Sequence, residues 1–180
     1  LDLLITQNVD GLHQRAGSNN VVDLHGRVDH VRCLTCEALH CRNQIQNLLE
    51  QHNEWPERNI SGARPDGDME VQGLALDSIT TPLCPNCGGD LRPDVVFFGG
   101  SVPHSRVNAC QQAIEQADAL LVVGSSLMVF SGYRFCRRAS KLNKPITIIN
   151  TGLTRGDSLA QTKLQTPAGP LLTDTVALLQ

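Results

Sequence analysis

Three apolar runs along this chain each end in small polar residues. Residues 1–5 (LDLLI) lead into Thr-Gln-Asn, residues 119–123 (ALLVV) into Gly-Ser-Ser, and residues 146–149 (ITII) into Asn-Thr-Gly. Short continuous apolar runs are typical of strands that are buried in a parallel sheet. We therefore expect three such strands, with their polar ends at the edge of the sheet where ligands bind.

Helical patterns alternate with these apolar runs. One helical pattern, residues 105–118, precedes the apolar run 119–123, and another, residues 132–144, precedes the run 146–149. A terminal helix is predicted over residues 170–180. The alternation predicts an α/β fold with a Rossmann-like parallel sheet. Two further apolar segments, residues 21–26 and 94–100, are also expected to be strands.

Two Cys-x-x-Cys pairs interrupt this pattern. Cys33 pairs with Cys36 and Cys84 with Cys87, and the second pair encloses Pro-Asn and precedes Gly-Gly, which suits a tight turn. Two such pairs predict a zinc site that is structural, because four thiolate ligands leave no position open for catalysis. The alternative is that the two pairs are unrelated. The insertion between them, residues 54–82, is predicted to be irregular.

The zinc module divides the chain into three predicted parts. Residues 1–29 and 94–180 are assigned to the first and second parts of the Rossmann-like domain. Residues 30–93 are assigned to a small zinc-binding domain that carries the insertion.

Composition limits the function classes that remain. The chain has 180 residues, of which 41% are hydrophobic, so it can bury a substantial core. A net charge of −3 and an aromatic content of 3% disfavour a nucleic-acid partner. The chain has no apolar run near the ~20 residues of a membrane helix, so no membrane partner is expected. Cys41, Cys110 and Cys136 stand outside the pairs, which indicates a reducing compartment and small buried hydrophobes.

The polar strand ends favour a nucleotide ligand. Glycine lets the backbone approach a phosphate closely, and serine or asparagine can hydrogen-bond to ribose and phosphate oxygens. The GxGxxG fingerprint of dinucleotide-binding folds is absent from the sequence. We therefore expect the first strand-to-helix turn to precede Leu1, and the chain to be an N-terminally truncated fragment.

Six motifs, taken together, resemble the sirtuins, the NAD-dependent protein deacylases, in their order and approximate spacing. They are TQNVDGLH (6–13), LHG (24–26), the two Cys-x-x-Cys pairs, RPDVVFFG (92–99), VVGSSLMV (122–129) and IINTG (148–152). Three more segments resemble class II of that family, which includes bacterial members and a mitochondrial lipoamidase and ADP-ribosyltransferase. They are RPDGD (64–68), SGYRF (131–135) and TGLTRGD (151–157).

The resemblance implies a role for each motif. It implies NAD and zinc as cofactors, His25, Asn8 and Asp10 as catalytic residues, and a structural role for His13. An imidazole can take a proton from a ribose hydroxyl near neutral pH, which suits His25 as the base. Turn capping is the alternative role of Asn8 and Asp10. The NAD-binding residues that it implies are Gln7, Asn8, Val9, Asp10, Gly124, Ser125, Ser126, Asn150, Thr151, Gly152 and Ala168.

The implied reaction removes an acyl group from lysine and releases nicotinamide and O-acyl-ADP-ribose. An acylated-lysine protein would bind as an extended strand between residues 96–99 and 127–129. Val96 and Phe97 would line the acyl-lysine tunnel, or would simply belong to the core. Gly100 stands where many relatives have an acidic residue, which affects only local peptide contacts.

Three other functions remain open at this point. The same pocket could serve an NAD-dependent protein ADP-ribosyltransferase, the chain could be a non-enzymatic zinc-ribbon module, or the fragment could be inert without an N-terminal NAD loop. The expected location is the bacterial cytoplasm, or the mitochondrial matrix if the protein is eukaryotic.

Overall fold

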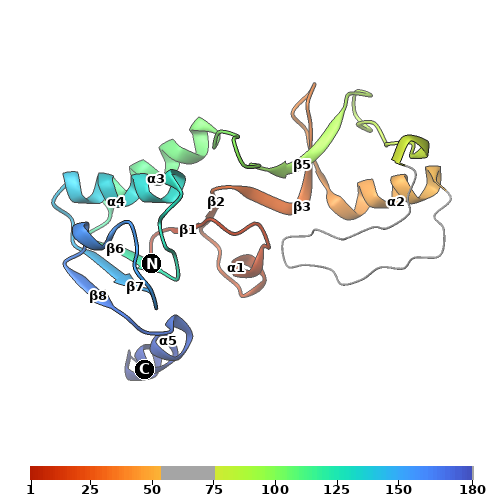
Figure 1. The fold of residues 1–180 in the computed structure, drawn as a ribbon. Helices are drawn as coiled ribbons and strands as arrows, with labels where there is room; N and C mark the ends of the chain where they lie inside the picture. The colour runs from red at the N-terminus through yellow and green to blue at the C-terminus, as the bar shows by residue number, and fades with distance from the viewer. Residues whose placement is uncertain (54–75, 180) are drawn as a thin grey trace. The chain divides into compact units, whose positions relative to one another are not determined.

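The computed structural model describes residues 1–53 and 76–179 (Figure 1). They form two compact units, one made by Leu1–Ile5 with Val102–Gln180 and the other by Thr6–Ser101. Most of the predicted insertion, with the RPDGD motif, lies outside the described residues. The division of the chain at residues 29 and 93 stays a prediction.

The unit that contains Val102–Gln180 is built on a three-stranded parallel sheet. Its strands are β6 (Leu120–Val123), β7 (Ile146–Ile149) and β8 (Thr162–Leu164), in the order β6-β7-β8. Leu120 lies opposite Ile146 and Val123 opposite Ile149, so β6 and β7 pair along their full length. The Rossmann-like parallel sheet predicted from the apolar runs is confirmed.

Two helices, α3 (His104–Gln116) and α4 (Phe130–Lys141), complete the core of this unit. The unit also contains a short 3-10 turn, η2 (Asp157–Leu159), and the helix α5 (Ala168–Leu179), which has no buried residue. α3 and α4 lie along the same side of the sheet (Figure 1). Buried side chains of α3, α4 and β7 form the core, namely Val107, Cys110, Ile114, Phe135, Cys136, Ala139, Ile146, Ile148 and Ile149. Burial raises the pKa of the Cys110 and Cys136 thiols to about 11, so both stay protonated and act as small apolar side chains.

The unit Thr6–Ser101 contains an antiparallel sheet. Its strands are β4 (Leu39–Cys41), β3 (Gly26–Cys33) and β5 (Leu91–Val95), in the order β4-β3-β5. α2 (Arg42–His52) follows β4 directly and buries Ile45 as its main apolar contact. A 3-10 turn, η1 (Leu76–Ser78), precedes the second cysteine pair.

A short two-stranded sheet precedes β3 in the chain. It joins β1 (Leu4–Thr6) to β2 (Val21–Asp23), with the single-turn helix α1 (Leu12–Arg15) between them. The Leu24 N–H donates to the carbonyl oxygen of Thr6 at 2.9 Å. The first apolar run therefore forms a three-residue strand beside β2, where the sequence predicted a longer strand of the parallel sheet.

The strand predicted over residues 94–100 is wrong in its bounds. β5 ends at Val95 and pairs antiparallel with β3, with Gly26 opposite Val95 and Cys33 opposite Leu91. Beyond it the chain turns, with the Gly100 N–H donating to the Phe97 carbonyl oxygen at 2.9 Å. The side chains of Phe97 and Phe98 are exposed, so their apolar character reflects a surface and not a buried strand.

Among the helices that the structure describes, none is both long enough and apolar enough to cross a membrane.

Candidate functional site

The four paired cysteines form one cluster in the unit Thr6–Ser101. Their sulfur atoms all lie within 4.8 Å of one another, with 3.5 Å between Cys33 and Cys87 and 3.8 Å between Cys36 and Cys84. A zinc ion with Zn–S bonds of about 2.3 Å in tetrahedral geometry holds its sulfurs roughly 3.8 Å apart. The cluster therefore fits zinc, and the predicted association of the two pairs is confirmed.

The two turns that carry these cysteines are set by the backbone. β3 ends at Cys33, whose sulfur accepts the N–H groups of Thr35 at 3.3 Å and Cys36 at 3.4 Å. The Gly88 N–H donates to the Cys84 carbonyl oxygen, and the Cys84 N–H to the Gly89 carbonyl oxygen, both at 2.8 Å. Backbone N–H groups that point at a sulfur stabilise its thiolate form, as zinc ligation requires.

The Cys33 and Cys87 thiols differ in pKa. The Cys36 N–H, together with that of Thr35, lowers the pKa of Cys33 to about 6. The Gly89 N–H lowers the pKa of Cys87, but the neighbouring Cys36 and Cys33 sulfurs outweigh it and raise that pKa to about 12. Thiolates this close repel one another, so a divalent cation is the group that would stabilise all four together.

His40 is a neighbour of the cluster that the sequence reasoning missed. It lies on β4 opposite Val31 of β3, is buried, and its Nε2 is 3.3 Å from the Cys84 sulfur. A histidine four residues after Cys36 was the available signal. An imidazole at this distance can donate a hydrogen bond to a metal-bound thiolate and hold it in place.

The backbone on both sides of His25 is held in place. Leu24 before it is fully buried, and the His25 carbonyl oxygen accepts the Val96 N–H at 2.8 Å. Gly26 after it has φ +85°, and a Cβ there would lie 1.8 Å from the Asp94 carbonyl oxygen. Only glycine fits this close crossing of β3 and β5, so the LHG motif sets both the position and the direction of the His25 side chain.

The His25 ring is oriented by Gln7. Its Nδ1 lies 2.9 Å from the Gln7 carbonyl oxygen. A carbonyl oxygen can only accept, so Nδ1 carries the proton in the neutral ring and Nε2 carries the lone pair. This arrangement suits a general base that acts through Nε2.

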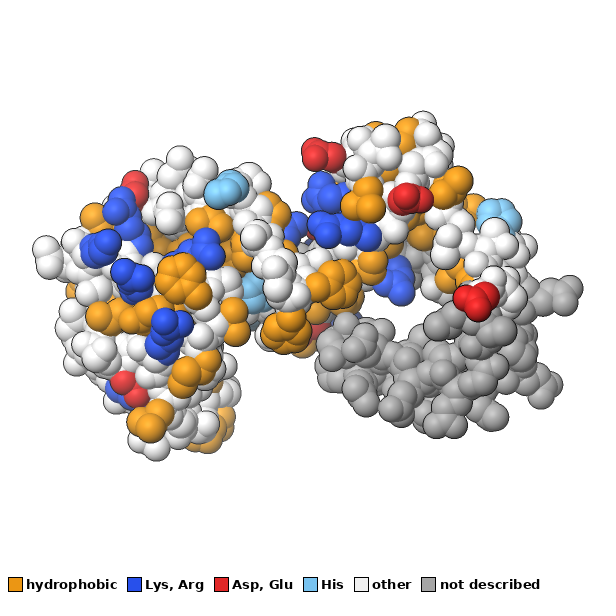
Figure 2. All heavy atoms as spheres, turned by 45° about the horizontal axis from the view of Figure 1, so that its top comes forward, with side chains coloured by type: hydrophobic (Ala, Val, Ile, Leu, Met, Phe, Trp, Pro, Cys, Tyr) orange, Lys and Arg blue, Asp and Glu red, His pale blue; other side chains and the backbone are white. Residues whose placement is uncertain are grey.

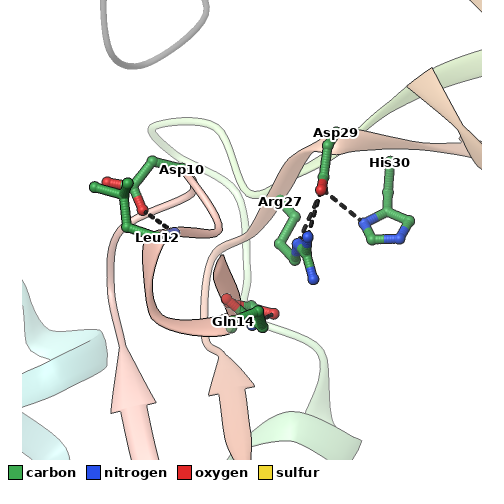
Figure 3. A network of polar contacts seen from close by, with 7 residues as sticks. Asp10, Leu12, Gln14, Arg27, Asp29 and His30 are labelled. Carbon is green, nitrogen blue, oxygen red and sulfur yellow. Dashed lines mark hydrogen bonds and ion pairs between the residues drawn. The ribbon is translucent and has the colours of Figure 1, made fainter. Parts of the chain in front are cut away.

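The loop after β1 is held by two local hydrogen bonds and by one to β3. The Thr6 hydroxyl accepts the Asn8 N–H at 3.1 Å, the Val9 carbonyl oxygen accepts the Val28 N–H at 2.9 Å, and the Asp10 carboxylate accepts the Leu12 N–H at 3.0 Å. Figure 3 shows the Asp10 carboxylate at the Leu12 N–H, before α1, and the separate pair of the Arg27 guanidinium with Asp29. Asp10 therefore has the capping role that was considered for it. Only one of its carboxylate oxygens accepts the Leu12 N–H.

The remaining predicted NAD-binding residues lie in the other unit, and all but Ala168 lie at one edge of the parallel sheet. The Gly124 N–H donates to the Ile149 carbonyl oxygen at 2.9 Å, and the Asn150 N–H to that of Leu164 at 3.1 Å. Residues 124–126 and 150–152 therefore follow adjacent parallel strands, while Ala168 is the first residue of α5. Polar groups gather at this edge as the strand ends predicted.

A different part of the same unit is strongly basic. An open groove on α3 and α4 is lined by Gln111, Phe130, Arg134, Arg137, Arg138 and Lys141. Figure 2 shows Lys and Arg side chains gathered on this face. The groove contains none of the residues predicted to bind NAD or to perform catalysis, and Glu115 on α3 pairs with Arg138.

Comparison with known proteins gives one consistent result. The Sir2 family model matches residues 1–131. A Bordetella bronchiseptica protein named NAD-dependent protein deacetylase is 48% identical over 98% of this chain, and a Xanthomonas campestris pv. campestris protein of the same name is 49% identical over 97% of it. A solved structure described as Sir2 bound to acetylated peptide has a TM-score of 0.75 and 26% identity, covering 99% of this chain and 63% of that one.

The matched relatives are longer than this chain. It spans 65% of the Bordetella protein and 64% of the Xanthomonas protein.

Proposed function

Since this chain belongs to the Sir2 family, we propose that the protein is an NAD-dependent protein-lysine deacylase. The observation that carries this proposal is the orientation of His25, whose Nδ1 faces the Gln7 carbonyl oxygen at 2.9 Å and leaves the lone pair on Nε2. The names of the Bordetella and Xanthomonas relatives support a deacetylase. Products of the proposed reaction are free lysine, nicotinamide and O-acyl-ADP-ribose.

His25 acts as the general base in this proposal. Nε2 takes the proton of a ribose hydroxyl of the bound dinucleotide, and the proton on Nδ1 remains hydrogen-bonded to Gln7 throughout. Gln7 therefore fixes the tautomer and stabilises the ring when it becomes positively charged. Asn8 and Asp10 lie on the loop that follows and contribute polar side chains to the nicotinamide and ribose side of the ligand.

NAD supplies the electrophilic ribose carbon when it is bound. The residues proposed to bind its adenosine side are Gly124, Ser125, Ser126, Asn150, Thr151, Gly152 and Ala168, while Gln7, Asn8, Val9 and Asp10 serve the nicotinamide side. The proximity of residues 124–126 and 150–152 at one sheet edge supports the first of these groups.

An acylated-lysine protein is the proposed substrate, bound as an extended strand. In this proposal the segments after β5 and β6 supply the backbone groups for such pairing. Val96 and the exposed Phe97 lie on the first segment, and residues 127–129, of which Met128 and Val129 are exposed, lie on the second. The bacterial origin of the relatives favours the bacterial cytoplasm over the mitochondrial matrix as the location.

The zinc site has a structural role in this proposal. Zinc held by Cys33, Cys36, Cys84 and Cys87 would tie the end of β3 to the turn that precedes β5. His25 precedes β3 and is hydrogen-bonded to the residue after β5, so the same two strands also position the base.

The direct test is a product analysis on the full-length protein. It is incubated with NAD and lysine peptides that carry acetyl, lipoyl or branched dicarboxylic acyl groups, and the products are followed by mass spectrometry. Deacylated peptide together with O-acyl-ADP-ribose is the expected result, and the rates identify the preferred acyl group. Transfer of ADP-ribose to protein without deacylation would replace the proposal with the ADP-ribosyltransferase function.

A further inference from the structure

The loop formed by residues 124–129 contains a strained residue. Leu127 has φ +57°, a left-handed conformation that a bulky side chain rarely adopts. Its side chain is also buried, with only 5% of its surface exposed. Such a conformation persists only where surrounding contacts hold it, and it is concentrated at functional sites.

Arg155 supplies contacts on both sides of Leu127. Its backbone N–H donates to the Ser126 carbonyl oxygen at 2.9 Å, and its Nη1 donates to the Met128 carbonyl oxygen at 3.2 Å. Within the loop, the Leu127 N–H donates to the Ser125 hydroxyl at 3.2 Å. One residue from a separate segment thus fixes the peptide groups before and after the strained position.

Tyr133 holds the Arg155 side chain in place. The guanidinium lies over the Tyr133 ring, 4.4 Å from its centroid. Tyr133 is in the first turn of α4, and its N–H donates to the Val129 carbonyl oxygen at 3.3 Å. Stacking restricts a guanidinium to one plane, so the fork reaches Met128 from a fixed direction.

The residue after Arg155 leaves space for the strained side chain. A Cβ on Gly156 would lie 2.7 Å from Leu127 Cδ1 and 3.3 Å from Ile148 Cδ1. The segment that carries both residues is itself fixed, because Asp157 accepts the Thr154 N–H at 3.1 Å and a hydrogen bond from Lys163 at 2.5 Å. The Arg155 side of the contact is therefore as well anchored as the loop.

We propose that Arg155, stacked on Tyr133, is a positioning residue that holds the 124–129 loop in the conformation that binds the acylated-lysine peptide. This inference rests on the proposed deacylase function. Met128 and Val129 are exposed, so the loop presents their surface to a ligand while Leu127 anchors it to the core. Arg155 acts through the carbonyl groups of Ser126 and Met128 and does not itself need to touch the peptide.

The test compares steady-state constants of full-length variants at saturating NAD. Arg155→Ala is expected to raise the KM for an acetylated peptide about tenfold while kcat changes less than about twofold, since a charge-assisted hydrogen bond to the loop is lost. Arg155→Lys, which keeps the charge without the planar fork, is expected to give an intermediate KM.

Tyr133→Phe keeps the ring and should match the wild type, whereas Tyr133→Leu should shift KM as Arg155→Ala does. Arg137→Ala, exposed on α4, is the control and should leave both constants unchanged.

Hydrogen exchange of residues 125–130 gives a readout that does not depend on turnover. In Arg155→Ala these amides are expected to exchange about tenfold faster than in the wild type. Arg137→Ala is the reference protein for the exchange rates and for the melting temperature. An unchanged peptide KM and unchanged exchange in Arg155→Ala would overturn the proposal. If Arg155→Ala does not fold, the peptide KM of Arg155→Lys and Tyr133→Leu decides whether the proposal holds. A wild type that removes no acyl group would refute the proposed function, and the exchange measurement would then test the loop contact alone.

Discussion

Nδ1 of His25 lies 2.9 Å from the carbonyl oxygen of Gln7. These residues are distant in sequence, and the hydrogen bond from the Leu24 N–H to the Thr6 carbonyl oxygen joins the two residues that precede them. The lone pair of the neutral ring is therefore on Nε2. The backbone carbonyl of Gln7 thus fixes the tautomer of His25.

The first prediction concerns His25→Ala in the full-length protein. Removal of a positioned base typically costs about a hundred- to ten-thousand-fold in rate, so deacylation should fall by that amount. NAD binding, measured by calorimetry, should persist because the backbone around residue 25 is unchanged. His52→Ala is the matched control, since this histidine is exposed at the end of α2. Deacylation at the wild-type rate in His25→Ala would exclude it as the base.

The second prediction concerns the zinc cluster. Cys84→Ala removes a buried sulfur that lies 3.8 Å from Cys36 and should give protein that is unfolded or free of zinc. Zinc content and far-ultraviolet circular dichroism measure the two effects. Cys41→Ala is the control, because Cys41 is exposed and stands outside the cluster. A folded and active Cys84→Ala protein without zinc would show that the metal is dispensable.

The third prediction separates His40 from the ligands themselves. Since its Nε2 is 3.3 Å from the Cys84 sulfur, His40→Ala should weaken zinc binding about 10–100-fold, as the loss of a group that orients a ligand usually does. Competition with a chromophoric chelator measures the affinity. The visible spectrum of the cobalt-substituted protein should retain four-sulfur coordination, and a spectrum with fewer sulfur ligands would contradict an orienting role.

The cysteine cluster and the parallel sheet could be predicted because their signals are local. Cys-x-x-Cys places two sulfurs in one turn whatever surrounds it. The apolar runs of β6 and β7 have the length of a buried strand and are too short for a typical helix. The resemblance added His25, whose role no periodicity could assign. Its orientation toward Gln7 appears only when both are placed in three dimensions.

The features that the sequence did not predict depend on contacts between distant segments. His40 approaches Cys84 only through the register of β4 on β3. Phe97 and Phe98 are as apolar as buried strand residues, yet the chain turns after Val95 and exposes them. The left-handed conformation of Leu127 is held by Arg155, which is remote in sequence. None of these contacts leaves a periodic pattern.

The fourth prediction concerns the close crossing of β3 and β5. Gly26→Ala would place a Cβ 1.8 Å from the Asp94 carbonyl oxygen at φ +85°, so the strands must separate, and the free energy of unfolding should fall by about 3 kcal/mol or more. Gly17→Ala is the control for strain alone, because φ there is +91° and no atom lies within 4 Å. It should cost only about 1–2 kcal/mol. Equal losses in chemical denaturation would show that the crossing is not the cause.

The last prediction concerns the dependence of stability on pH at Asp157. Hydrogen bonds from Lys163, then from Thr154, lower the pKa of Asp157 from 3.8 to about 2. A carboxyl whose pKa is lower in the folded state contributes stability that is complete above the unfolded pKa and is lost as the pH falls through the folded pKa. Asp157→Asn should therefore be less stable than the wild type at pH 7, and the difference should shrink between about pH 4 and pH 2.

Urea denaturation of the wild type and Asp157→Asn at several pH values measures this difference in stability. Asp118→Asn, at an exposed position between α3 and β6, is the reference for a simple change of charge. A difference between wild type and Asp157→Asn that stays constant down to pH 2 would show that the ion pair with Lys163 does not stabilise the fold.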